Sequence, residues 1–234
     1  MEDKELKHEF ELERVILFSD AVFAIIITIM ILDVKLPEGL KHASADEIKH
    51  AFKELMPKLF AYMASFGLIG VFWTRHLKIF KNLRDYDMKL VAGNLFFLFV
   101  ISLFPFAIST ITSGLTLNNY WTVDIYLGII LTGIFAQTII IGHIVKHKEK
   151  LSFNPEAIED ILKWKAMKYN YFIYPLAMIT LIVLTIIQVE PTFIMYTLVV
   201  YALAIRVISN KYYPVKKKLK LKEEEIESQI AIDN

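Results

Sequence analysis

The polar residues with the clearest chemical potential lie at the start of a long apolar segment. Arg14 and Asp20 flank the stretch Val15-Ile16-Leu17-Phe18-Ser19, and an apolar run continues from Ala21 to Leu32. A carboxylate a few residues inside a helix of hydrocarbon length is costly to insert, so it normally serves packing or function. In such a medium Asp20 must be protonated or paired with a donor. We therefore expect a first membrane helix whose polar head contacts other helices.

A helical wheel separates the carboxylate from an apolar stripe. At about 100° per residue, Ile25, Ile29 and Leu32 lie within about 60° of one another, and Thr28 borders them. Asp20 lies on the far side of the same helix. The simplest interpretation is that the apolar stripe meets lipid and that Asp20 faces the helical bundle.

Partners for Asp20 are expected on the second and third apolar segments. Trp73 and His76 lie near the end of the second segment, and Asn94 lies near the beginning of the third. If the helices alternate in direction, all three reach the depth of Asp20. The indole N–H of Trp73 or the ring of His76 would donate to the carboxylate. An interfacial histidine without such a partner is the other interpretation of His76.

The sequence contains none of the common catalytic motifs. The phosphate-binding loop G-x-x-x-x-G-K-[ST], the metal-binding helix H-E-x-x-H and the nucleophile elbow G-x-S-x-G are all missing. The absence of cysteine excludes disulfides, zinc thiolate sites and a cysteine nucleophile. His143 and His147 have helical spacing, but a basic segment next to the membrane explains them better than a metal site. We expect neither an enzyme nor a bound metal.

The elements that position these residues follow from composition and hydropathy. Of the 234 residues, 56% are hydrophobic, and the mean hydropathy of +0.47 is too high for an ordinary soluble domain. A helix needs about 20 apolar residues to cross a bilayer. Six segments meet this length, at residues 14–34, 57–75, 89–113, 121–145, 170–189 and 191–209. We predict an all-α, multi-pass membrane protein with one domain over residues 1–210 and a charged tail over 211–234.

The two ends of the predicted bundle differ in basic residues. Twenty-one of the 26 Lys and Arg residues fall in the two termini and in the connections that follow the second and fourth helices. The other five lie between Lys35 and Lys58. Because cytoplasmic segments carry the excess of Lys and Arg, both termini are predicted to be cytoplasmic.

Two connections are predicted to contain short amphipathic helices. In the segment 37–56 the helix would be capped by Ser44 or Asp46. In the segment 154–168 it would begin at Asn154-Pro155-Glu156. Pro191 is suited to the first turn of the sixth membrane helix.

The motif residues resemble those of a known family. Arg14-x-x-x-Phe18-Ser19-Asp20, with the apolar run after it, is similar to the first-helix signature of the lysosomal potassium channel family, transmembrane protein 175, and its bacterial six-helix members. The resemblance extends to Phe72-Trp73-Thr74-Arg75-His76, to Asn94-Leu95-Phe96-Phe97-Leu98 and to Leu103-Phe104-Pro105-Phe106. It covers the first half of the chain, and the second half matches only in helix count.

The resemblance implies a potassium-selective cation channel that needs no cofactor, with potassium ions as the permeant species. It implies a homotetramer in membrane lipid, in the bacterial plasma membrane, with no nucleic-acid partner. The first helix of each subunit would line a central pore. Ile25, Ile29 and Leu32 would form its constriction and hydrophobic gate, and Thr28 would contribute to ion selectivity. The residues implied to hold the helices together are Arg14, Phe18, Ser19, Asp20, Trp73, His76 and Asn94.

A proton-coupled secondary transporter is the alternative function, with Asp20 and His76 as a proton relay. Transporters of this kind often contain paired segments interrupted by Gly or Pro in corresponding halves of the chain. The sequence offers Pro105 as one such break without a counterpart. The channel is therefore the preferred interpretation.

Overall fold

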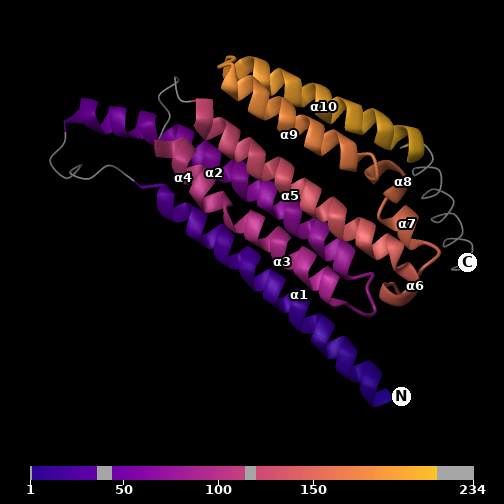
Figure 1. Cartoon of the computed structure of the whole chain (residues 1–234). Coiled ribbons are helices and arrows are strands. Elements are labelled where there is room, and N and C mark those ends of the chain that lie inside the picture. The colour runs from indigo at the N-terminus through magenta and orange to yellow at the C-terminus, as the bar shows by residue number, and fades with distance from the viewer. Residues whose placement is uncertain (1, 36–43, 114–119, 215–234) are drawn as a thin grey trace, which may run out of the picture.

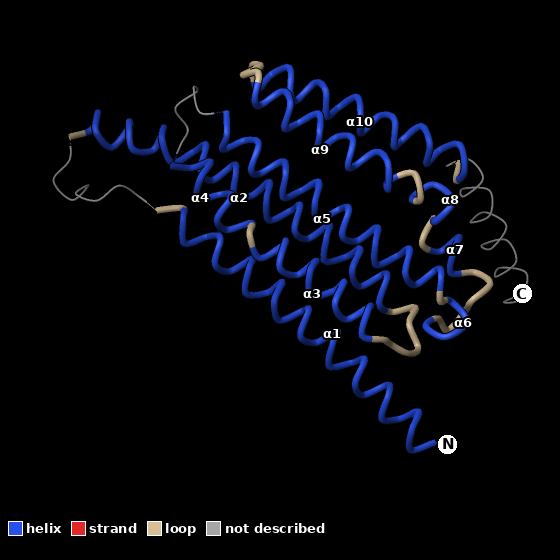
Figure 2. Tube along the Cα trace, viewed as in Figure 1, coloured by secondary structure: helices blue, strands red, loops and turns tan. Residues whose placement is uncertain are grey.

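The computed structural model describes residues 2–35, 44–113 and 120–214, and this part of the chain is built from helices (Figures 1 and 2). The long helices are α1 (Glu2–Met30), α2 (Ala45–Phe80), α3 (Met88–Ser102), α4 (Phe104–Ser113), α5 (Tyr120–Lys146), α9 (Asn170–Ile186) and α10 (Pro191–Tyr212). The short ones are η1 (Ile31–Asp33), α6 (Lys148–Leu151), α7 (Ile158–Ile161) and α8 (Trp164–Met167). The all-α prediction is confirmed. Most of the predicted tail, residues 215–234, lies outside the described residues.

The long helices lie side by side, with α1 at one edge and the pair α9 and α10 at the other (Figure 1). Two apolar cores hold them together. The larger core joins α1 to α5 and includes the fully buried rings of Phe23, Phe72 and Phe97. The smaller core joins α5, α9 and α10 around Leu131 and Ile194. Helix α5 therefore belongs to both cores and connects the two halves of the bundle.

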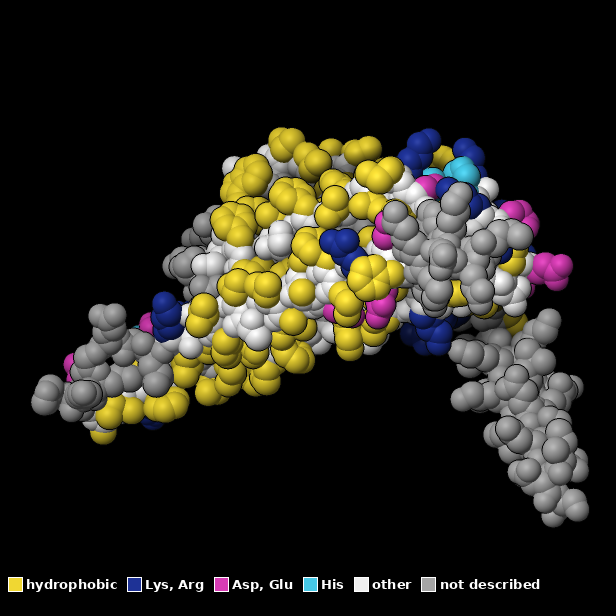
Figure 3. Space-filling model, turned by 90° about the horizontal axis from the view of Figure 1, so that it is seen from below, with side chains coloured by type: hydrophobic (Ala, Val, Ile, Leu, Met, Phe, Trp, Pro, Cys, Tyr) yellow, Lys and Arg dark blue, Asp and Glu magenta, His cyan; other side chains and the backbone are white. Residues whose placement is uncertain are grey.

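Five helical stretches of the described residues are long and apolar enough to cross a membrane. They are Ala45–Phe80, Met88–Ile111, Trp121–Lys146, Trp164–Ile186 and Thr192–Tyr212. Helix α1 is not among them, because Glu13, Arg14 and Asp20 place three charged residues in its last 18 residues. Hydrophobic side chains cover much of the face in Figure 3, as expected where lipid replaces water. The chain is an integral membrane protein, and the crossing by α1 stays a prediction.

Helix α2 is longer than the predicted second segment. It begins at Ala45, because Ser44 accepts a hydrogen bond from the Glu47 N–H and the Glu47 carboxylate accepts one from the Ser44 N–H. Ser44 is thus the predicted cap. The separate amphipathic helix predicted in the segment 37–56 is wrong for its described part, because the helix continues through Pro57 to Phe80. Residues 36–43 lie outside the described residues.

Prolines affect the helices differently according to their position. The predicted third segment is divided at Leu103 into α3 and α4, just before Pro105, which has no N–H to continue the helical hydrogen bonds. Pro175 lies inside α9, which stays continuous, so it is no counterpart to the break before Pro105. Pro191 occupies the first turn of α10, as predicted.

The segment 154–168 does not form the single helix that was predicted. Its described structure contains two one-turn helices, α7 and α8, separated at Lys163. The backbone φ angle of Lys163 is +56°, which ends one helix and redirects the chain before the next. Asn154 still acts as a local cap, because its side-chain oxygen accepts a hydrogen bond from the Ala157 N–H.

Candidate functional site

Helix α1 presents two different faces within one subunit. The side chains of the apolar stripe are exposed in the subunit: Ile25 is 55% exposed, Ile29 44% and Leu32 62%. The helical wheel predicted that this face contacts lipid or another subunit. The opposite face is buried against α2 to α4 and consists of Ser19, Phe23, Ile26 and Met30. The subunit thus uses one side of α1 for its own core and leaves the other side open.

Thr28 lies on the open face and bonds to its own helix. Its hydroxyl lies 3.0 Å from the carbonyl oxygen of Ala24 and 2.9 Å from that of Ile25. A threonine hydroxyl that donates its proton to the preceding turn keeps its oxygen lone pairs available. Thr28 therefore offers an oxygen ligand on an otherwise apolar stripe.

Asp20 is anchored by α2. The indole N–H of Trp73 donates to Oδ1 of Asp20 over 2.8 Å. Asp20 is half-buried, and Trp73 is exposed along part of its ring. The predicted contact between Trp73 and Asp20 is present, and it joins the second half of α1 to the C-terminal part of α2.

A second polar contact joins α1, α2 and α3 through three buried side chains. The amide nitrogen of Asn94 donates to the hydroxyl of Ser19 over 2.9 Å, and Ser19 donates to the carbonyl oxygen of Val15 over 2.8 Å. Because Asn94 donates through its nitrogen, its oxygen accepts a hydrogen bond from Nε2 of His76, 2.8 Å away. Each donor in this Ser19–Asn94–His76 chain has an acceptor.

The ring of His76 is held by aromatic side chains as well. It stacks on Phe80 with centroids 4.2 Å apart and lies nearly parallel to Phe97 at 5.9 Å. With the proton on Nε2, the other ring nitrogen, Nδ1, is an acceptor, and it is buried without a partner in the described part of the chain. This environment favours a neutral imidazole in a fixed tautomer.

The prediction that Trp73 or His76 donates to Asp20 is confirmed for Trp73. Of the three expected partners, Trp73 bonds to Asp20, whereas His76 and Asn94 bond to each other and through Asn94 to Ser19. The reason is the helical rotation of about 100° between adjacent residues, which turns Ser19 into the core and Asp20 toward its edge. The helical wheel placed these two residues apart but did not assign their partners.

Arg14 and Phe18 are the two exposed signature residues of α1. They line a cavity of about 460 Å³ together with Tyr86, Asn94 and several apolar side chains. The hydroxyl of Tyr86 donates a hydrogen bond to the carboxylate of Glu11. This hydrogen bond raises the pKa of Tyr86 above its ordinary value. This cavity lies beside the buried Ser19–Asn94–His76 chain and opens toward the outside of the subunit.

Sequence reasoning missed one polar contact that joins two helices. Asp87 caps α3 by accepting from the Leu90 N–H, and its carboxylate also lies 2.9 Å from Nε2 of His143 on α5. Burial acts to raise the pKa of Asp87, but these two hydrogen bonds outweigh it and hold the pKa below the ordinary value. The sequence signal was an aspartate immediately before an apolar helix, the usual position of a cap.

Two further polar residues of α5 form hydrogen bonds with other helices. Gln137 donates to the backbone oxygen of Phe72, and Asp124 accepts from the hydroxyl of Thr185. His147 lies next to His143, with ring centroids 4.4 Å apart. Among the described residues, no group of three or more His, Asp or Glu side chains is arranged to hold a metal ion.

Fold and site together define an all-helical, multi-pass membrane protein whose first helix is tied by polar contacts to the second and third. The sequence pattern of the family described as endosomal/lysosomal potassium channel TMEM175 matches residues 14–105. A potassium channel from Chryseobacterium sp. (strain P1-3) is 37% identical over 147 residues, which cover 62% of this chain and 71% of that protein. The chain belongs to the TMEM175 family, which consists of ion channels and not of enzymes.

Two further comparisons extend this result. The human endosomal/lysosomal proton channel TMEM175 is 35% identical over 77 residues, which cover 31% of this chain and 15% of the human protein. The crystal structure of a lysosomal potassium-selective channel TMEM175 homolog from Chamaesiphon minutus is similar with a TM-score of 0.60 and 21% sequence identity. That comparison covers 83% of this chain and 98% of the other, and it concerns the fold.

Proposed function

We propose that this protein is a potassium-selective cation channel in which α1 of each of four subunits lines a central pore. The observation that carries the proposal is the open stripe of Ile25, Ile29 and Leu32 on a helix whose opposite face is fixed in the subunit core. Membership of the TMEM175 family and the potassium channel from Chryseobacterium support potassium as the permeant ion.

In this proposal the apolar stripe forms the constriction and the gate. Four copies of Ile25, Ile29 and Leu32 around a symmetry axis would make successive hydrophobic rings. A narrow ring of this kind blocks ions by excluding water, and a small rotation or outward shift of α1 would widen and hydrate it. The lipid-facing interpretation of the stripe would require a different helix to line the pore.

Ion preference is assigned to Thr28 and to dehydration at the rings. Apolar rings offer no carbonyl oxygens to replace the water around an ion, so discrimination must come from the different costs of dehydrating potassium and sodium. The Thr28 oxygen, with its proton directed back to the helix, supplies a ligand next to the Ile25 and Ile29 rings.

The signature residues are assigned to packing and not to conduction. Ser19, Asn94 and His76 are buried in the subunit, and Asp20 is occupied by Trp73, so these side chains hold α1 against α2 and α3. Arg14 and Phe18, which are exposed in one subunit, are proposed to contact the neighbouring subunit of the homotetramer.

The proposal also includes a membrane orientation. We infer six crossing helices, with α1 as the first, in the plasma membrane of a bacterium and with both termini cytoplasmic. The unequal distribution of Lys and Arg supports this orientation, because 21 of 26 would lie on the cytoplasmic side. The subunit would form one channel domain over residues 1–210 with a charged tail over 211–234.

The transporter alternative depends on a proton relay between Asp20 and His76. The described hydrogen bonds give the two residues different partners, Trp73 for Asp20 and Asn94 for His76. A direct proton transfer between them would require both contacts to break. The geometry therefore favours the channel.

Ion flux through liposomes separates the two functions. The purified protein is reconstituted into vesicles with a potassium gradient, concentrated buffer of equal pH on both sides to hold the pH, and a proton ionophore to carry the compensating charge. We expect potassium efflux that follows the potassium gradient and exceeds sodium efflux under matched conditions. Flux that appears only with an imposed proton gradient would contradict the channel and favour the transporter.

A further inference from the structure

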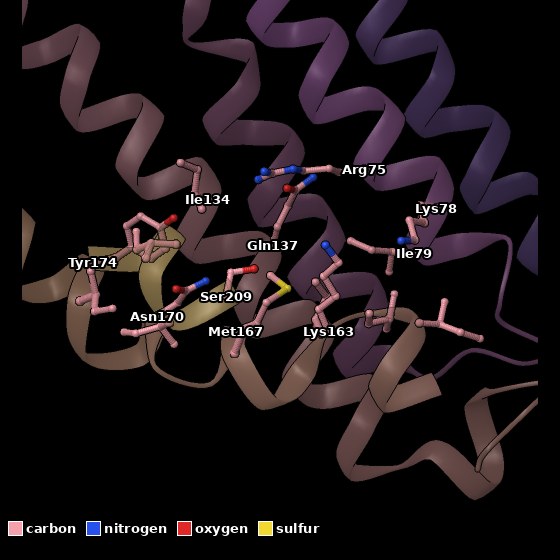
Figure 4. Close-up of a pocket in the computed structure, with 17 residues that line it drawn as sticks. Arg75, Lys78, Ile79, Ile134, Gln137, Lys163, Met167, Asn170, Tyr174 and Ser209 are labelled. Atoms are coloured by element: carbon pink, nitrogen blue, oxygen red, sulfur yellow. The ribbon is translucent and has the colours of Figure 1, made fainter. Parts of the chain in front are cut away.

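A second cavity lies away from the stripe of α1, between α2 and α5 on one side and α9 and α10 on the other. It measures about 290 Å³ and is bounded by residues of α2, α5, α8, α9 and α10 (Figure 4). It is located where the larger core around α1 to α5 meets the smaller core of α5, α9 and α10. Whatever occupies it would touch both halves of the subunit.

The charged groups of this cavity are all basic. Arg75, Lys78 and Lys163 contribute to its lining, and none of the 17 lining residues is acidic. In Figure 4 the guanidinium of Arg75 and the ammonium of Lys163 both point toward the amide of Gln137. Within the described residues, Arg75 and Lys163 form no ion pair. The acidic residues of α7 pair with other lysines, Glu159 with Lys148 and Asp160 with Lys165.

Lys163 reaches the cavity from an unusual backbone conformation. Its φ of +56° lies in the left-handed region, which residues other than glycine seldom adopt. Such conformations persist where the surroundings impose them and often occur at binding sites. Here the turn at Lys163 brings its side chain to the same cavity as Arg75, which belongs to α2 and is distant in sequence.

The remaining lining divides into polar and apolar parts. Asn170, Tyr174 and Ser209 add neutral hydrogen-bonding groups, and the isoleucines at 134, 141, 173, 205 and 208 add an apolar wall. A small hydrophilic anion would use the cations but leave this wall unmatched. A phosphate ester that carries an apolar chain matches both parts.

We propose that this cavity binds the headgroup of an anionic phospholipid. The phosphate lies between Arg75 and Lys163, the polar side chains bond to the glycerol part, and the acyl chains leave along the apolar wall. This site is separate from the α1 pore and independent of the channel proposal. Its occupant joins α2 to α8 and α10 at the basic end of the bundle.

Lipid titration of the purified protein, followed by native mass spectrometry, tests the proposal. Phosphatidylglycerol is compared with phosphatidylcholine of the same acyl chains, and soluble glycerol phosphate is added as a competitor. We expect phosphatidylglycerol to bind at least about tenfold more tightly, because both lipids carry the phosphate but the choline cation of phosphatidylcholine is repelled by Arg75 and Lys163 in a cavity lined by no acidic residue. Glycerol phosphate at equal concentration should displace little of it.

Variants locate the binding. The double variant Arg75→Gln/Lys163→Gln should lose the preference for phosphatidylglycerol, whereas Arg75→Lys/Lys163→Arg should keep most of it. The matched control Lys81→Gln/Lys165→Gln removes the same charge from neighbouring positions that do not line the cavity. Circular dichroism and elution volume show that each variant is folded.

Three outcomes would overturn the proposal. They are equal binding of the two lipids by the unmodified protein, equal loss in the double variant and its control, and full displacement by glycerol phosphate. The last outcome would assign the cavity to a soluble phosphate compound.

Discussion

Neighbouring residues of α1 serve different helices. Ser19 bonds to Asn94 of α3, whereas Asp20 bonds to Trp73 of α2. The conspicuous charge is at the edge of the core, and the less conspicuous serine is at its centre. The polar contacts of α1 are therefore spread over two helices, and the loss of one partner leaves the other contact in place.

The substitution Asn94→Leu tests the buried chain. Leucine has a similar size but leaves Nε2–H of His76 without an acceptor, which costs about 1–3 kcal/mol for a buried donor. We expect the unfolding midpoint in detergent to fall by several degrees. Asn210→Leu, at an exposed position of α10, is the control and should change the midpoint little. Equal midpoints for the two variants would contradict a structural role for Asn94.

The substitution Thr28→Val tests the selectivity assignment. Valine keeps the shape of threonine and removes its hydroxyl, so the rings stay apolar while the oxygen ligand is lost. We expect the potassium-to-sodium permeability ratio, measured from reversal potentials in bilayers, to fall severalfold with potassium conductance preserved. The control is Thr197→Val on α10, where the threonine hydroxyl also donates to a carbonyl oxygen of its own helix. This variant should leave the ratio unchanged. An unchanged ratio in Thr28→Val would remove the threonine from the selectivity mechanism.

The sequence predicted which face of α1 each residue occupies better than it predicted the contacts between helices. Periodicity was sufficient to separate Ile25 and Leu32 from Asp20, because the direction of a side chain depends on position along one helix. The contact between His76 and Asn94 depends on how three helices are rotated against one another, which a single periodic pattern does not encode. The bond between Asp87 and His143 was missed for the same reason.

At the scale of elements, helix ends deviate most from prediction. Hydropathy identified the long helices, since apolar length determines where they lie. It did not show that α2 starts at Ala45, because the capping box of Ser44 and Glu47 extends the helix into a polar segment. It also predicted one helix over 154–168, where the positive φ of Lys163 produces two.

Asp87 connects the start of α3 to the end of α5, and its contribution depends on pH. Its pKa is held below the ordinary 3.8, so the carboxylate stabilises the fold at neutral pH and loses this effect as pH falls through the lowered value. We expect Asp87→Asn to lower the unfolding midpoint at pH 7. The difference from the unmodified protein should shrink below about pH 4.

The control for this prediction is Asp46→Asn, an exposed aspartate in the first turn of α2. It should produce a smaller change at pH 7. A constant difference between Asp87→Asn and the unmodified protein from pH 7 to pH 3 would show that the carboxylate charge is not what stabilises this contact.

At the scale of the whole molecule, one subunit is incomplete for the proposed function. The stripe of Ile25, Ile29 and Leu32 is open in the subunit, and apolar side chains of α9 and α10 are exposed at the opposite edge. In the proposed channel, a conducting path along α1 therefore needs several copies of the subunit to surround the stripe.

The tie between Asp20 and Trp73 should influence assembly more than permeation. The substitution Asp20→Ala removes the carboxylate that binds Trp73, so α1 can move relative to α2 near residue 20. This movement would misplace the stripe in the assembly. We expect native mass spectrometry to show less tetramer, with the permeability ratio of the remaining channels unchanged. Trp73→Phe, which keeps the ring and removes the N–H, should have the same effect. A full yield of tetramers with altered selectivity would assign Asp20 to the pore.

The most direct test of the central claim, that the α1 stripe lines the pore, is chemical modification of single cysteines. The chain contains no cysteine, so Ile25→Cys and Leu32→Cys each create one thiol. Leu176→Cys on α9 is the control, because Leu176 is also 55% exposed in the subunit but lies far from the stripe. A cationic methanethiosulfonate reagent should irreversibly reduce the potassium current of the two α1 variants and leave the control unchanged. Unchanged currents in both α1 variants after confirmed modification, or equal block of the control, would contradict the claim that the α1 stripe lines the pore.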